Sequence, residues 1–368
     1  MPQPLSGLLV LDFTTLLPGP LATLLLAEAG AEVVKIEQPD GDEMRRHGPH
    51  LDGESVPFAM LNRGKAGLAL DLKSREGHAR LAPLLARADV LVEQFRPGVM
   101  ARLGLGYAAV RQVNPRIVYC SISGYGQSWP RAGEAGHDLN YVGATGLLAL
   151  NPGPADQPTV PPALVADIGG GSFPAVMNIL LALRQRDRTG EGCQVDIAMA
   201  DAMFTFAWHA FATGQASGRY PGAAEAALAG GSPRYALYPT RDSRLVACAA
   251  LEQKFWLAFC AAIGLAAPLA DDAVDPAATK AAVAAIIAGR TADDWRPVLA
   301  AVDCCATIVV SLAEAVCDPH FVGRGLFANH VTGPAGTAIA ALPVPIAPLF
   351  RDGETRKGAP PLDRTGSS

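Results

Sequence analysis

Residues 8–36 of the chain, LLVLDFTTLLPGPLATLLLAEAGAEVVKI, predict a strand, a helix and a second strand in succession. Residues 8–13 are a short apolar run, which the segment Pro18-Gly19-Pro20 interrupts. Residues 21–29 have a helical pattern that ends at a glycine, the residue expected just after a helix. Residues 31–36 are a second short apolar run. This order is typical of a strand–helix–strand unit of an α/β fold.

The same alternation continues along the first third of the chain. We expect a strand at residues 67–72, a helix from Ser74 to about residue 88, and strands at residues 89–92 and 116–122. Strands that alternate with helices favour a parallel, doubly wound sheet. The sequence therefore predicts a Rossmann-like α/β domain.

Ligands of such sheets bind beyond the carboxyl ends of the strands. Here those ends are followed by residues 12–20, 37–40, 93–98 and 123–126, which form the expected binding rim. The first strand-to-helix turn reads Leu-Leu-Pro-Gly-Pro instead of Gly-x-Gly-x-x-Gly, and proline lacks the amide that a pyrophosphate would need. Dinucleotide binding is not expected.

The chain has 368 residues, more than one hydrophobic core usually supports. A Gly- and Ala-rich stretch at residues 214–231 reads as a linker between a large domain, residues 1–213, and a smaller α+β domain, residues 232–324. Residues 341–348 contain too many prolines for a central strand or a helix. We expect them to cross back as part of a segment, residues 325–368, that completes the large domain.

Composition excludes several classes of protein. The net charge of -5 is mild, and no cluster of Lys or Arg interleaved with aromatic residues offers a surface for nucleic acid. No run approaches the roughly 20 uninterrupted apolar residues of a membrane span, so no membrane partner is expected. The seven cysteines are scattered and contain no C-x-x-C pair, which favours reduced thiols and a cytoplasmic location.

Two ionisable residues stand out in Gly-rich segments. His137 lies in Gly136-His137-Asp138, ahead of an apolar helical stretch at residues 142–150, and Asp167 precedes three consecutive glycines. A base that titrates near neutral pH and a carboxylate could act on opposite faces of one carbon acid. Backbone amides around residues 169–171 could stabilise negative charge on an oxygen. The alternative for each residue is a structural role, as a helix cap or in the core.

Other residues are weaker candidates. Glu252 follows an apolar run at residues 245–251 and heads a helical segment, where an ordinary first-turn Glu is the alternative. Basic residues near the ends of strands would suit a phosphorylated ligand or the solvated surface: Lys65, Lys73, Arg96 and Arg102. No metal site is expected, because the spacing of four histidines does not match that of metal ligands: His47, His50, His320 and His330.

Several motifs resemble a known family. They are Gly30-Ala31-Glu32-Val33-Val34-Lys35-Ile36-Glu37, Asp71-Leu72-Lys73-Ser74, Phe95-Arg96-Pro97-Gly98-Val99 and Gly136-His137-Asp138-Leu139-Asn140-Tyr141. The chain resembles the class III CoA-transferase superfamily (CaiB/BaiF) and, within it, most closely the alpha-methylacyl-CoA racemases. The resemblance implies a Rossmann-like domain completed by the C-terminus, a smaller domain and an interlocked homodimer.

The resemblance also implies the chemistry. In the racemases the residues that match His137 and Asp167 are the acid/base pair, and the match to Glu252 reaches the site from the partner chain. The expected reaction is racemisation of a 2-methylacyl-CoA thioester by 1,1-proton transfer at C2 through an enolate. No cofactor is expected, because CoA is part of the substrate. The alternatives are a CoA-transferase in which Asp167 is a covalent nucleophile, and a noncatalytic acyl-CoA-binding protein.

A set of CoA contacts follows from the same resemblance. One departure is visible at Gln38, where related enzymes often have an arginine that touches the nucleotide. Arg45 or Arg46 could take its place. The residues expected to contact CoA or the acyl group are Leu70, Asp71, Leu72, Lys73, Gln94, Phe95, Arg96, Arg102, Gly136, Asp138, Leu139, Asn140 and Tyr141.

Overall fold

The computed structural model describes residues 3–151, 153–154, 156–351 and 353–363. The chain divides into two compact units. The larger unit comprises Met1–Thr145, Pro162–Met203 and Pro319–Ser368, and the smaller unit comprises Gly146–Pro161 and Phe204–Asp318. Segments from three parts of the sequence therefore build the larger unit.

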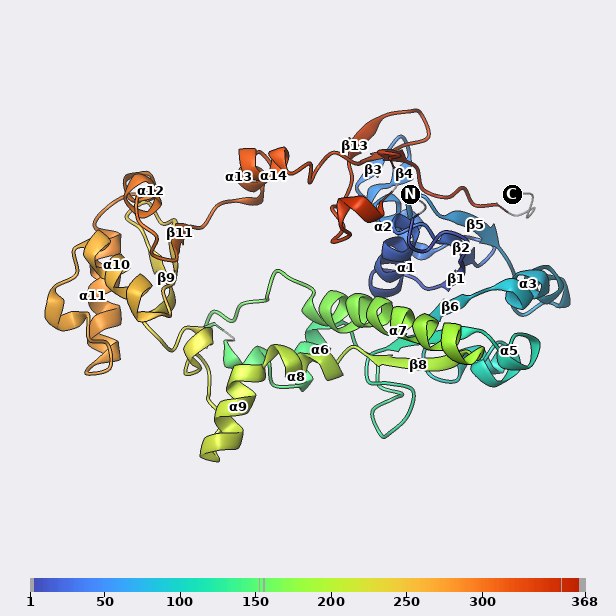
Figure 1. Cartoon of the computed structure of the whole chain (residues 1–368), viewed down its shortest axis with the longest axis horizontal. Helices are drawn as coiled ribbons and strands as arrows, with labels where there is room; N and C mark the ends of the chain where they lie inside the picture. The colour runs from blue at the N-terminus through green and yellow to red at the C-terminus, as the bar shows by residue number, and fades with distance from the viewer. Residues whose placement is uncertain (1–2, 152, 155, 352, 364–368) are drawn as a thin grey trace. The chain divides into compact units, whose positions relative to one another are not determined.

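A six-stranded parallel sheet is the centre of the larger unit (Figure 1). Its strand order is β5-β2-β1-β6-β7-β8, and every neighbouring pair is parallel. The expected parallel, doubly wound sheet is confirmed. The strands are β1 (Leu9–Phe13), β2 (Glu32–Glu37), β5 (Ala66–Ala69), β6 (Val90–Glu93), β7 (Val118–Ser123) and β8 (Cys193–Ala198).

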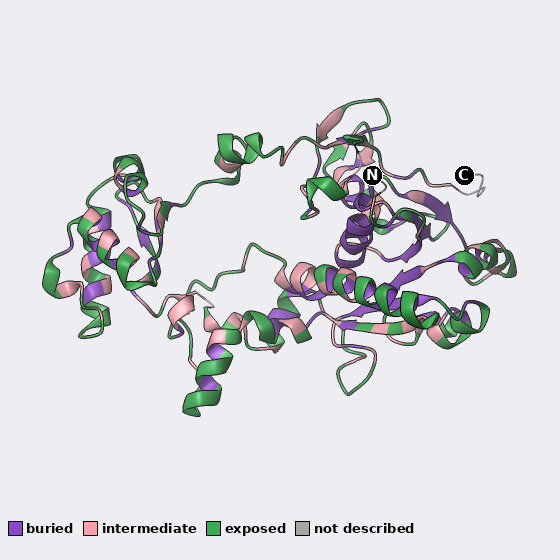
Figure 2. Cartoon of the chain, viewed as in Figure 1, coloured by how far each residue is buried: buried purple, intermediate pink, exposed green. Residues whose placement is uncertain are grey.

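Five strands, β1, β2, β5, β6 and β7, are mostly buried because both faces of the sheet are covered there. Figure 2 shows this buried part of the sheet, whereas the edge strand β8 is mostly partly buried or exposed. On one face Leu11 and Leu91 pack with Leu81 of α3 and Val110 of α5. On the other face α1 packs against α7. The helices are α1 (Pro18–Glu28), α3 (Arg75–Arg87), α4 (Val99–Arg102), α5 (Tyr107–Val113), α6 (Asp138–Ala144) and α7 (Phe173–Thr189).

The C-terminal segment covers part of α1. The Pro-rich stretch has neither helix nor strand from Ala341 to Ala347, as expected. Arg63 donates a hydrogen bond to the Leu342 carbonyl (3.0 Å), and Val344 packs with Leu21, Leu25 and Leu61. The short elements of this region are β3 (His50–Leu51), β4 (Glu54–Ser55), η1 (Glu43–Arg46), α2 (Val56–Asn62), α14 (Pro319–Gly323), β12 (His330–Thr332), β13 (Ala338–Ala340), η6 (Pro348–Phe350) and β14 (Arg356–Lys357).

The smaller unit contains a three-stranded antiparallel sheet with helices packed on it. Trp256, Phe259 and Trp295 lie at the centre of its core and are almost fully buried. Its elements are η2 (Leu148–Leu150), α9 (Trp208–Ser217), η4 (Ala227–Ala229), β9 (Tyr235–Pro239), β10 (Leu245–Ala249), α10 (Gln253–Ile263), η5 (Ala267–Leu269), α11 (Pro276–Ala288), α12 (Ala292–Ala300), β11 (Ala306–Ile308) and α13 (Leu312–Ala315); α8 (Asp201–Phe206) spans the boundary of the two units.

The bounds of the units differ from those expected. Residues 146–161 and 204–213 belong to the smaller unit, although they were expected in the large domain. The expected linker, residues 214–231, contains the last turn of α9 and the short helix η4. Alanine favours helix, so an Ala-rich composition does not by itself mark a linker. Residues 364–368 of the expected C-terminal part lie outside the described residues.

One helical stretch of the larger unit is unusually apolar. Ala166–Thr189, with 24 residues, is long and apolar enough to cross a membrane by length and composition alone. Core helices of soluble proteins pass the same test, and 44% of the most apolar part of this helix is buried. Four large apolar side chains of α7 are nevertheless exposed: Phe173, Met177, Leu180 and Leu181.

Candidate active site

The loops that follow β1 and β6 meet where the chain order of the sheet reverses. The amide of Gly19, in the first turn of α1, donates a hydrogen bond to Oε1 of Gln94 (2.9 Å) in the loop after β6. Ligands of open α/β sheets bind at such a reversal. Gln94 was expected to contact CoA, and here its side chain fixes the loop after β1.

Two buried ion pairs fix the loop after β1 and the start of α1. Lys65 forms an ion pair with Asp12 (Nζ to Oδ2, 3.0 Å) and also donates to the Pro20 carbonyl (3.0 Å). Lys35 pairs with Asp42 (3.1 Å) and donates to the Thr14 carbonyl (2.8 Å). Burial raises the pKa of Asp12, but the charges of Lys65 and Lys35 outweigh that effect and hold it well below its usual range. Lys65, a candidate for binding phosphate, is therefore a structural residue.

His137 stands at the N-cap position of α6. Its backbone amide donates to Oδ1 of Asn140 (3.0 Å), so the Asn140 side chain closes the first turn. The helix starts at Asp138 instead of residue 142 as expected, because capping lets polar residues occupy a first turn. The His137 side chain is exposed.

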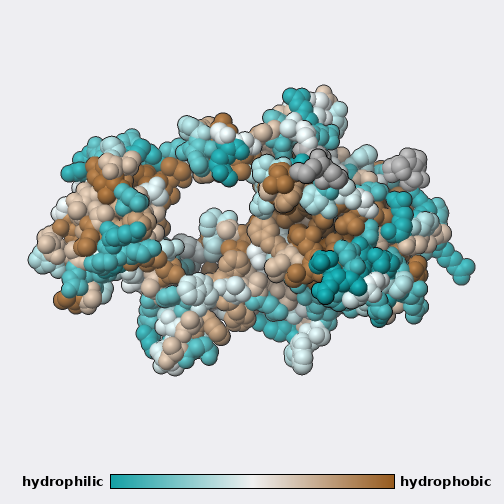
Figure 3. Space-filling view, viewed as in Figure 1, coloured by the Kyte–Doolittle hydropathy of each residue, from teal (hydrophilic) through white to brown (hydrophobic). Residues whose placement is uncertain are grey.

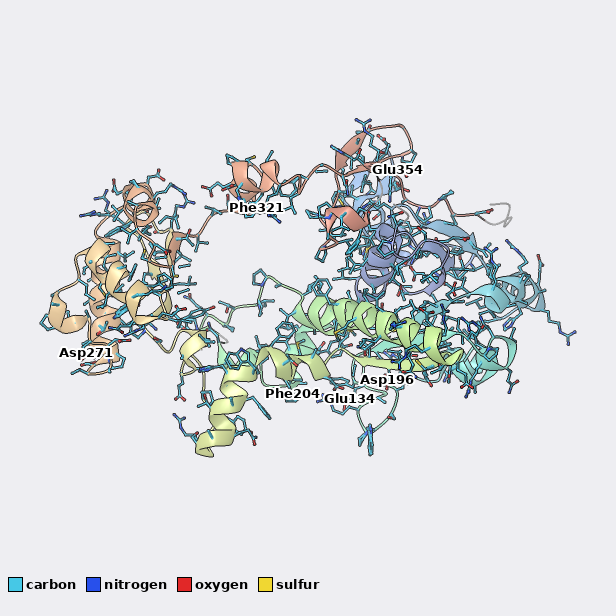
Figure 4. All side chains as sticks on the ribbon, viewed as in Figure 1. Glu134, Asp196, Phe204, Asp271, Phe321 and Glu354 are labelled. Atoms are coloured by element: carbon cyan, nitrogen blue, oxygen red, sulfur yellow. The ribbon has the colours of Figure 1, made fainter. Side chains whose placement is uncertain are left out.

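A pocket of about 420 Å³ opens beside His137. Six of the expected site residues line it: Phe95, Arg96, Gly136, His137, Asn140 and Tyr141. Ser123, which ends β7 and lies in the expected binding rim, lines it as well. Glu134 also lines it and was not singled out from the sequence. Glu134 lies in the loop between β7 and α6 (Figure 4).

Tyr141 gives this pocket its shape. A Cβ atom on Gly124 would lie 2.5 Å from the Tyr141 ring, and one on Gly136 would lie 2.8 Å from it. The Tyr141 hydroxyl donates to the Gly136 carbonyl (2.5 Å), and its ring meets Tyr125 edge to face, with 5.2 Å between centroids. Burial, with the charge of Asp167 nearby, raises the pKa of Tyr141 to about 12. Glycines at 124 and 136 are therefore needed for ring packing.

Asp167 is the second residue of η3 (Ala166–Ser172), a π-helical turn that continues into α7. Its side chain is half-buried. Burial, followed by the negative charge of Asp138, raises the pKa of Asp167 to about 6, and the positive charge of His137 opposes this rise. Asp167 thus shares an electrostatic environment with the expected partner, His137.

The glycines after Asp167 serve packing. Gly170 and Gly171 are buried in η3. A Cβ atom on Gly170 would clash with the Met199 carbonyl, and one on Gly171 would lie 3.0 Å from Cβ of Pro18. The Ser172 hydroxyl donates to the Pro18 carbonyl (2.7 Å). Gly170 and Gly171 therefore let η3 pack closely against Met199 and Pro18. That amides around residues 169–171 stabilise negative charge on an oxygen stays a prediction.

The other expected contacts have varied environments. Leu70 is 2% exposed and packs in the core of the sheet. Asp71 accepts from the Lys73 amide (2.9 Å) at the start of α3. The carboxylate of Asp138 is buried and bonded to backbone amides. Exposed side chains among the expected contacts are Asp71, Lys73, Arg96, Arg102, Leu139 and Asn140, and partly buried ones are Leu72, Gln94 and Phe95.

The region around Gln38 was expected to depart from the family pattern. Gln38 donates to the Gly41 carbonyl (3.0 Å). Arg45 binds Glu37 through two hydrogen bonds of 2.7 Å and lies over the Phe58 ring, 3.9 Å from its centroid. Arg45 is thus committed to the protein, whereas Arg46 is exposed.

Glu252 belongs to the smaller unit. It is the N-cap residue of α10, at the start of the helix as the sequence indicated. Its side chain is exposed and forms no capping hydrogen bond. In the part of the chain that the structure describes, no group of three or more His, Cys, Asp or Glu side chains could hold a metal ion.

Comparison with known proteins identifies the family. Residues 5–365 match CoA-transferase family III. The acetyl-CoA:oxalate CoA-transferase of Acetobacter aceti is 33% identical over 99% of this chain and 94% of its own length. The alpha-methylacyl-CoA racemase of Homo sapiens is 33% identical over 88% of this chain and 82% of its own length.

A solved structure agrees with this result. The CaiB/BaiF family protein from Brucella suis superimposes with a TM-score of 0.82 at 29% identity, covering 100% of this chain and 98% of its own. The fold and these relatives define an enzyme class in which CoA-transferases and racemases share one architecture. The chain belongs to CoA-transferase family III.

Proposed function

We propose that the protein racemises or epimerises 2-methylacyl-CoA thioesters by moving a proton at C2. The observation that carries this proposal is the environment of Asp167, whose pKa burial and Asp138 raise to about 6 while the nearby His137 opposes the rise. Histidine is the side chain that ordinarily changes charge near neutral pH. An imidazole and a carboxyl group whose pKa is raised in this way can exchange acid and base roles, as racemisation in both directions requires.

The proton balance is simple. One member of the pair, His137 or Asp167, removes the C2 proton and leaves an enolate, and the other delivers a proton to the opposite face. The thioester acidifies the C2 hydrogen, and the first backbone amides of α6, at Asp138 and Leu139, are candidates to donate to the enolate oxygen. No redox step occurs, so the reaction needs no cofactor, and CoA is only the handle of the substrate.

Exposed cations support CoA as that handle. Lys73, Arg96 and Arg102 are exposed in the described structure, and Arg96 lines the pocket beside His137. Guanidinium and ammonium groups bind phosphate oxygens through charge-assisted hydrogen bonds. We expect these three residues to hold the phosphates and the pantetheine arm.

A homodimer is the proposed assembly. Phe173 and Met177 at the start of α7 are exposed, and the space-filling view shows hydrophobic residues at the surface of the larger unit (Figure 3). In the smaller unit Phe206, Trp208 and Phe211 are also exposed. Apolar surface of this kind favours association. We propose that a second copy of the chain covers it and contributes Glu252 to each site, and that the protein acts in the cytoplasm.

Proton exchange tests the racemase proposal. A single enantiomer of a 2-methylacyl-CoA is followed by proton NMR in deuterium oxide, without an acceptor acid. The expected result is loss of the C2 proton with appearance of the other epimer. His137→Ala and Asp167→Asn should lower the rate by at least about 100-fold, since each removes one acid/base group. Asp187→Asn, an exposed carboxylate on the same helix, is the matched control. Retention of the C2 proton by the wild type would refute the proposal.

Mixing inactive chains tests the shared site. His137→Ala and Glu252→Ala are expressed together, so that mixed dimers form. If each site uses Glu252 of the partner, mixed dimers contain one complete site, and activity should return to about a quarter of wild type by random assembly. Absence of recovery, with mixed dimers confirmed by mass spectrometry, would place Glu252 outside the partner's site.

CoA transfer is the second candidate function. The match to the Acetobacter aceti transferase extends over 99% of this chain, farther than the match to the human racemase. In this reaction the Asp167 carboxylate attacks the thioester carbonyl, CoA thiolate leaves, and a mixed anhydride forms. Trapping Asp167 with hydroxylamine, together with transfer of CoA to added carboxylic acids, would favour this function.

A further inference from the structure

We infer that Asp138 is a positioning residue of the acid/base pair. Its carboxylate links the backbone of Asp167 to α6, the helix for which His137 is the N-cap residue. This inference rests on the proposed function. The resemblance to known proteins had suggested instead that Asp138 contacts CoA or the acyl group. The environment of its carboxylate supports the positioning role.

Two hydrogen bonds carry the argument. Asp138 Oδ1 accepts from the backbone amide of Ala166 at 2.7 Å and from that of Asp167 at 2.9 Å. Asp138 itself is only 6% exposed. The first amides of a helix have no partner within the helix. For the first amides of η3, the acceptor is the Asp138 carboxylate, 28 residues before Ala166 in the sequence. A local capping residue normally supplies this acceptor.

Asp138 is linked directly to both residues of the acid/base pair. His137 precedes Asp138 in the chain, and the amide of Asp167 is one of the two donors. Asn140 fixes the other side by accepting from the His137 amide. The backbones of the two reacting residues thus belong to one hydrogen-bonded unit. Acid/base catalysis is sensitive to misplacement of about 1 Å, which can lower a rate by about 100-fold.

The charge of Asp138 acts on the same carboxyl group. After burial, it is the next largest cause that raises the pKa of Asp167. η3 packs against α1, α6, α7 and β8. From α6 and its cap, the ionisable groups are His137, Asp138 and Tyr141. From the other three elements they are Glu28 in α1, Cys193 and Asp196 in β8, and Arg184, Arg186, Asp187 and Arg188 in the last turns of α7.

Two substitutions separate geometry from charge. Asp138→Asn keeps the Oδ1 acceptor and removes the charge, whereas Asp138→Ala removes both. We expect Asp138→Ala to lower kcat for C2 proton exchange by about 10- to 100-fold with KM within about threefold of wild type. Asp138→Asn should recover most of kcat and move the acidic midpoint of the pH–rate profile about half to one pH unit lower, because Asp167 loses a neighbouring negative charge.

A matched control addresses stability. Asp275 caps α11 in the smaller unit by accepting from the Ala278 amide (2.9 Å). Asp275→Ala also removes a helix-capping carboxylate, and it should leave both kcat and the pH profile unchanged. A purely structural role of Asp138 would make the two alanine variants alike, and that result would overturn the inference. A rise of KM above about tenfold in Asp138→Ala with unchanged kcat would also overturn it, in favour of a substrate contact.

A measurement without substrate keeps this inference distinct from the proposed function. Carbon-13 NMR of the protein labelled at aspartate carboxyl groups, with Asp167→Asn to assign the signal, follows the titration of Asp167 directly. We expect a lower midpoint in Asp138→Asn than in wild type. An unchanged midpoint would overturn the electrostatic part of the inference whatever reaction the enzyme catalyses. Failure of proton exchange in the wild type, with the midpoint shifted as expected, would refute only the racemase function.

Discussion

The two units differ in what they bury. Among the described residues, the buried polar side chains of the smaller unit are Thr240 and Thr279, and neither is charged. The larger unit buries charged side chains in its parallel sheet, including Asp12 of β1, Lys35 of β2 and Lys65 just before β5. The smaller unit therefore has a core of apolar packing. In the larger unit, the buried charges lie where the loop after β1 must keep one conformation beside the candidate site.

The largest effect should come from breaking the buried pair. Lys65→Met leaves Asp12 buried beside one fewer positive charge, and we expect a loss of about 3–5 kcal/mol in the free energy of unfolding. Urea denaturation followed by far-UV circular dichroism measures it. Lys254→Met, which changes an exposed lysine, should stay within about 0.5 kcal/mol of wild type. A loss below about 1 kcal/mol for Lys65→Met would show that the buried charges do not stabilise the larger unit.

Truncation of a buried apolar side chain tests the core of the smaller unit. Ile287 is fully buried in the core of the smaller unit, and Ile287→Ala should cost about 2–4 kcal/mol through lost burial and a cavity. Tryptophan fluorescence reports this loss, because Trp256 and Trp295 are buried in the same core. The effect should be the same at pH 5 and pH 8, since that core buries no charged group. A strong pH dependence would contradict the contrast between the units.

Asp167 should reduce stability at neutral pH. Its folded pKa of about 6 lies above the ordinary value near 3.9, so the folded state binds more protons between these pH values and stability falls as pH rises through them. Above about pH 6 the full cost applies. Asp167→Asn should therefore stabilise the protein by about 1 kcal/mol at pH 7, a figure reduced for partial exposure, and by nearly nothing at pH 3.5. Thermal unfolding at the two pH values measures the difference.

The smallest effect should come from an exposed ion pair of the larger unit. Arg87 and Glu32 lie 3.2 Å apart, with side chains 60% and 59% exposed. Arg87→Ala should change the free energy of unfolding by less than about 0.5 kcal/mol, and less still in 0.5 M salt. Compared with Lys65→Met, this result would show that burial, rather than the presence of an ion pair, sets the contribution to the free energy of unfolding. An effect above about 1.5 kcal/mol would contradict it.

Local patterns in the sequence predicted much of the larger unit. Short apolar runs identified β1, β2, β6 and β7 within one or two residues, and Ser74 correctly marked the start of α3, where its hydroxyl accepts from the Gly77 amide. β8 was not recognised, because polar Gln194 and Asp196 interrupt its apolar pattern at the edge of the sheet (Figure 4). Pattern-based prediction thus works best for strands with two covered faces.

The sequence proposed the residues of the candidate site, and the structure places six of them around one pocket, but the sequence did not show their contacts. The Gly-rich setting of His137 and Asp167 directed attention to both. Nothing local shows that Asp138 binds amides 28 residues later, or that Gly170 and Gly171 pack against Met199 and Pro18. Such contacts depend on which segments the sheet brings together. The side chain of Glu252 is exposed in the smaller unit, and only the resemblance to the racemases gave this residue a role.

The return of the C-terminal segment to α1 has a consequence for protein synthesis. Residues 8–36 leave the ribosome before Val344 and the Leu342 carbonyl, which pack against Leu25 and accept from Arg63, and most of the smaller unit is synthesised in between. During that interval the nascent chain exposes an apolar face of α1. The larger unit therefore completes its fold after the smaller unit has been synthesised, and chaperones that bind nascent apolar segments have time to act on α1.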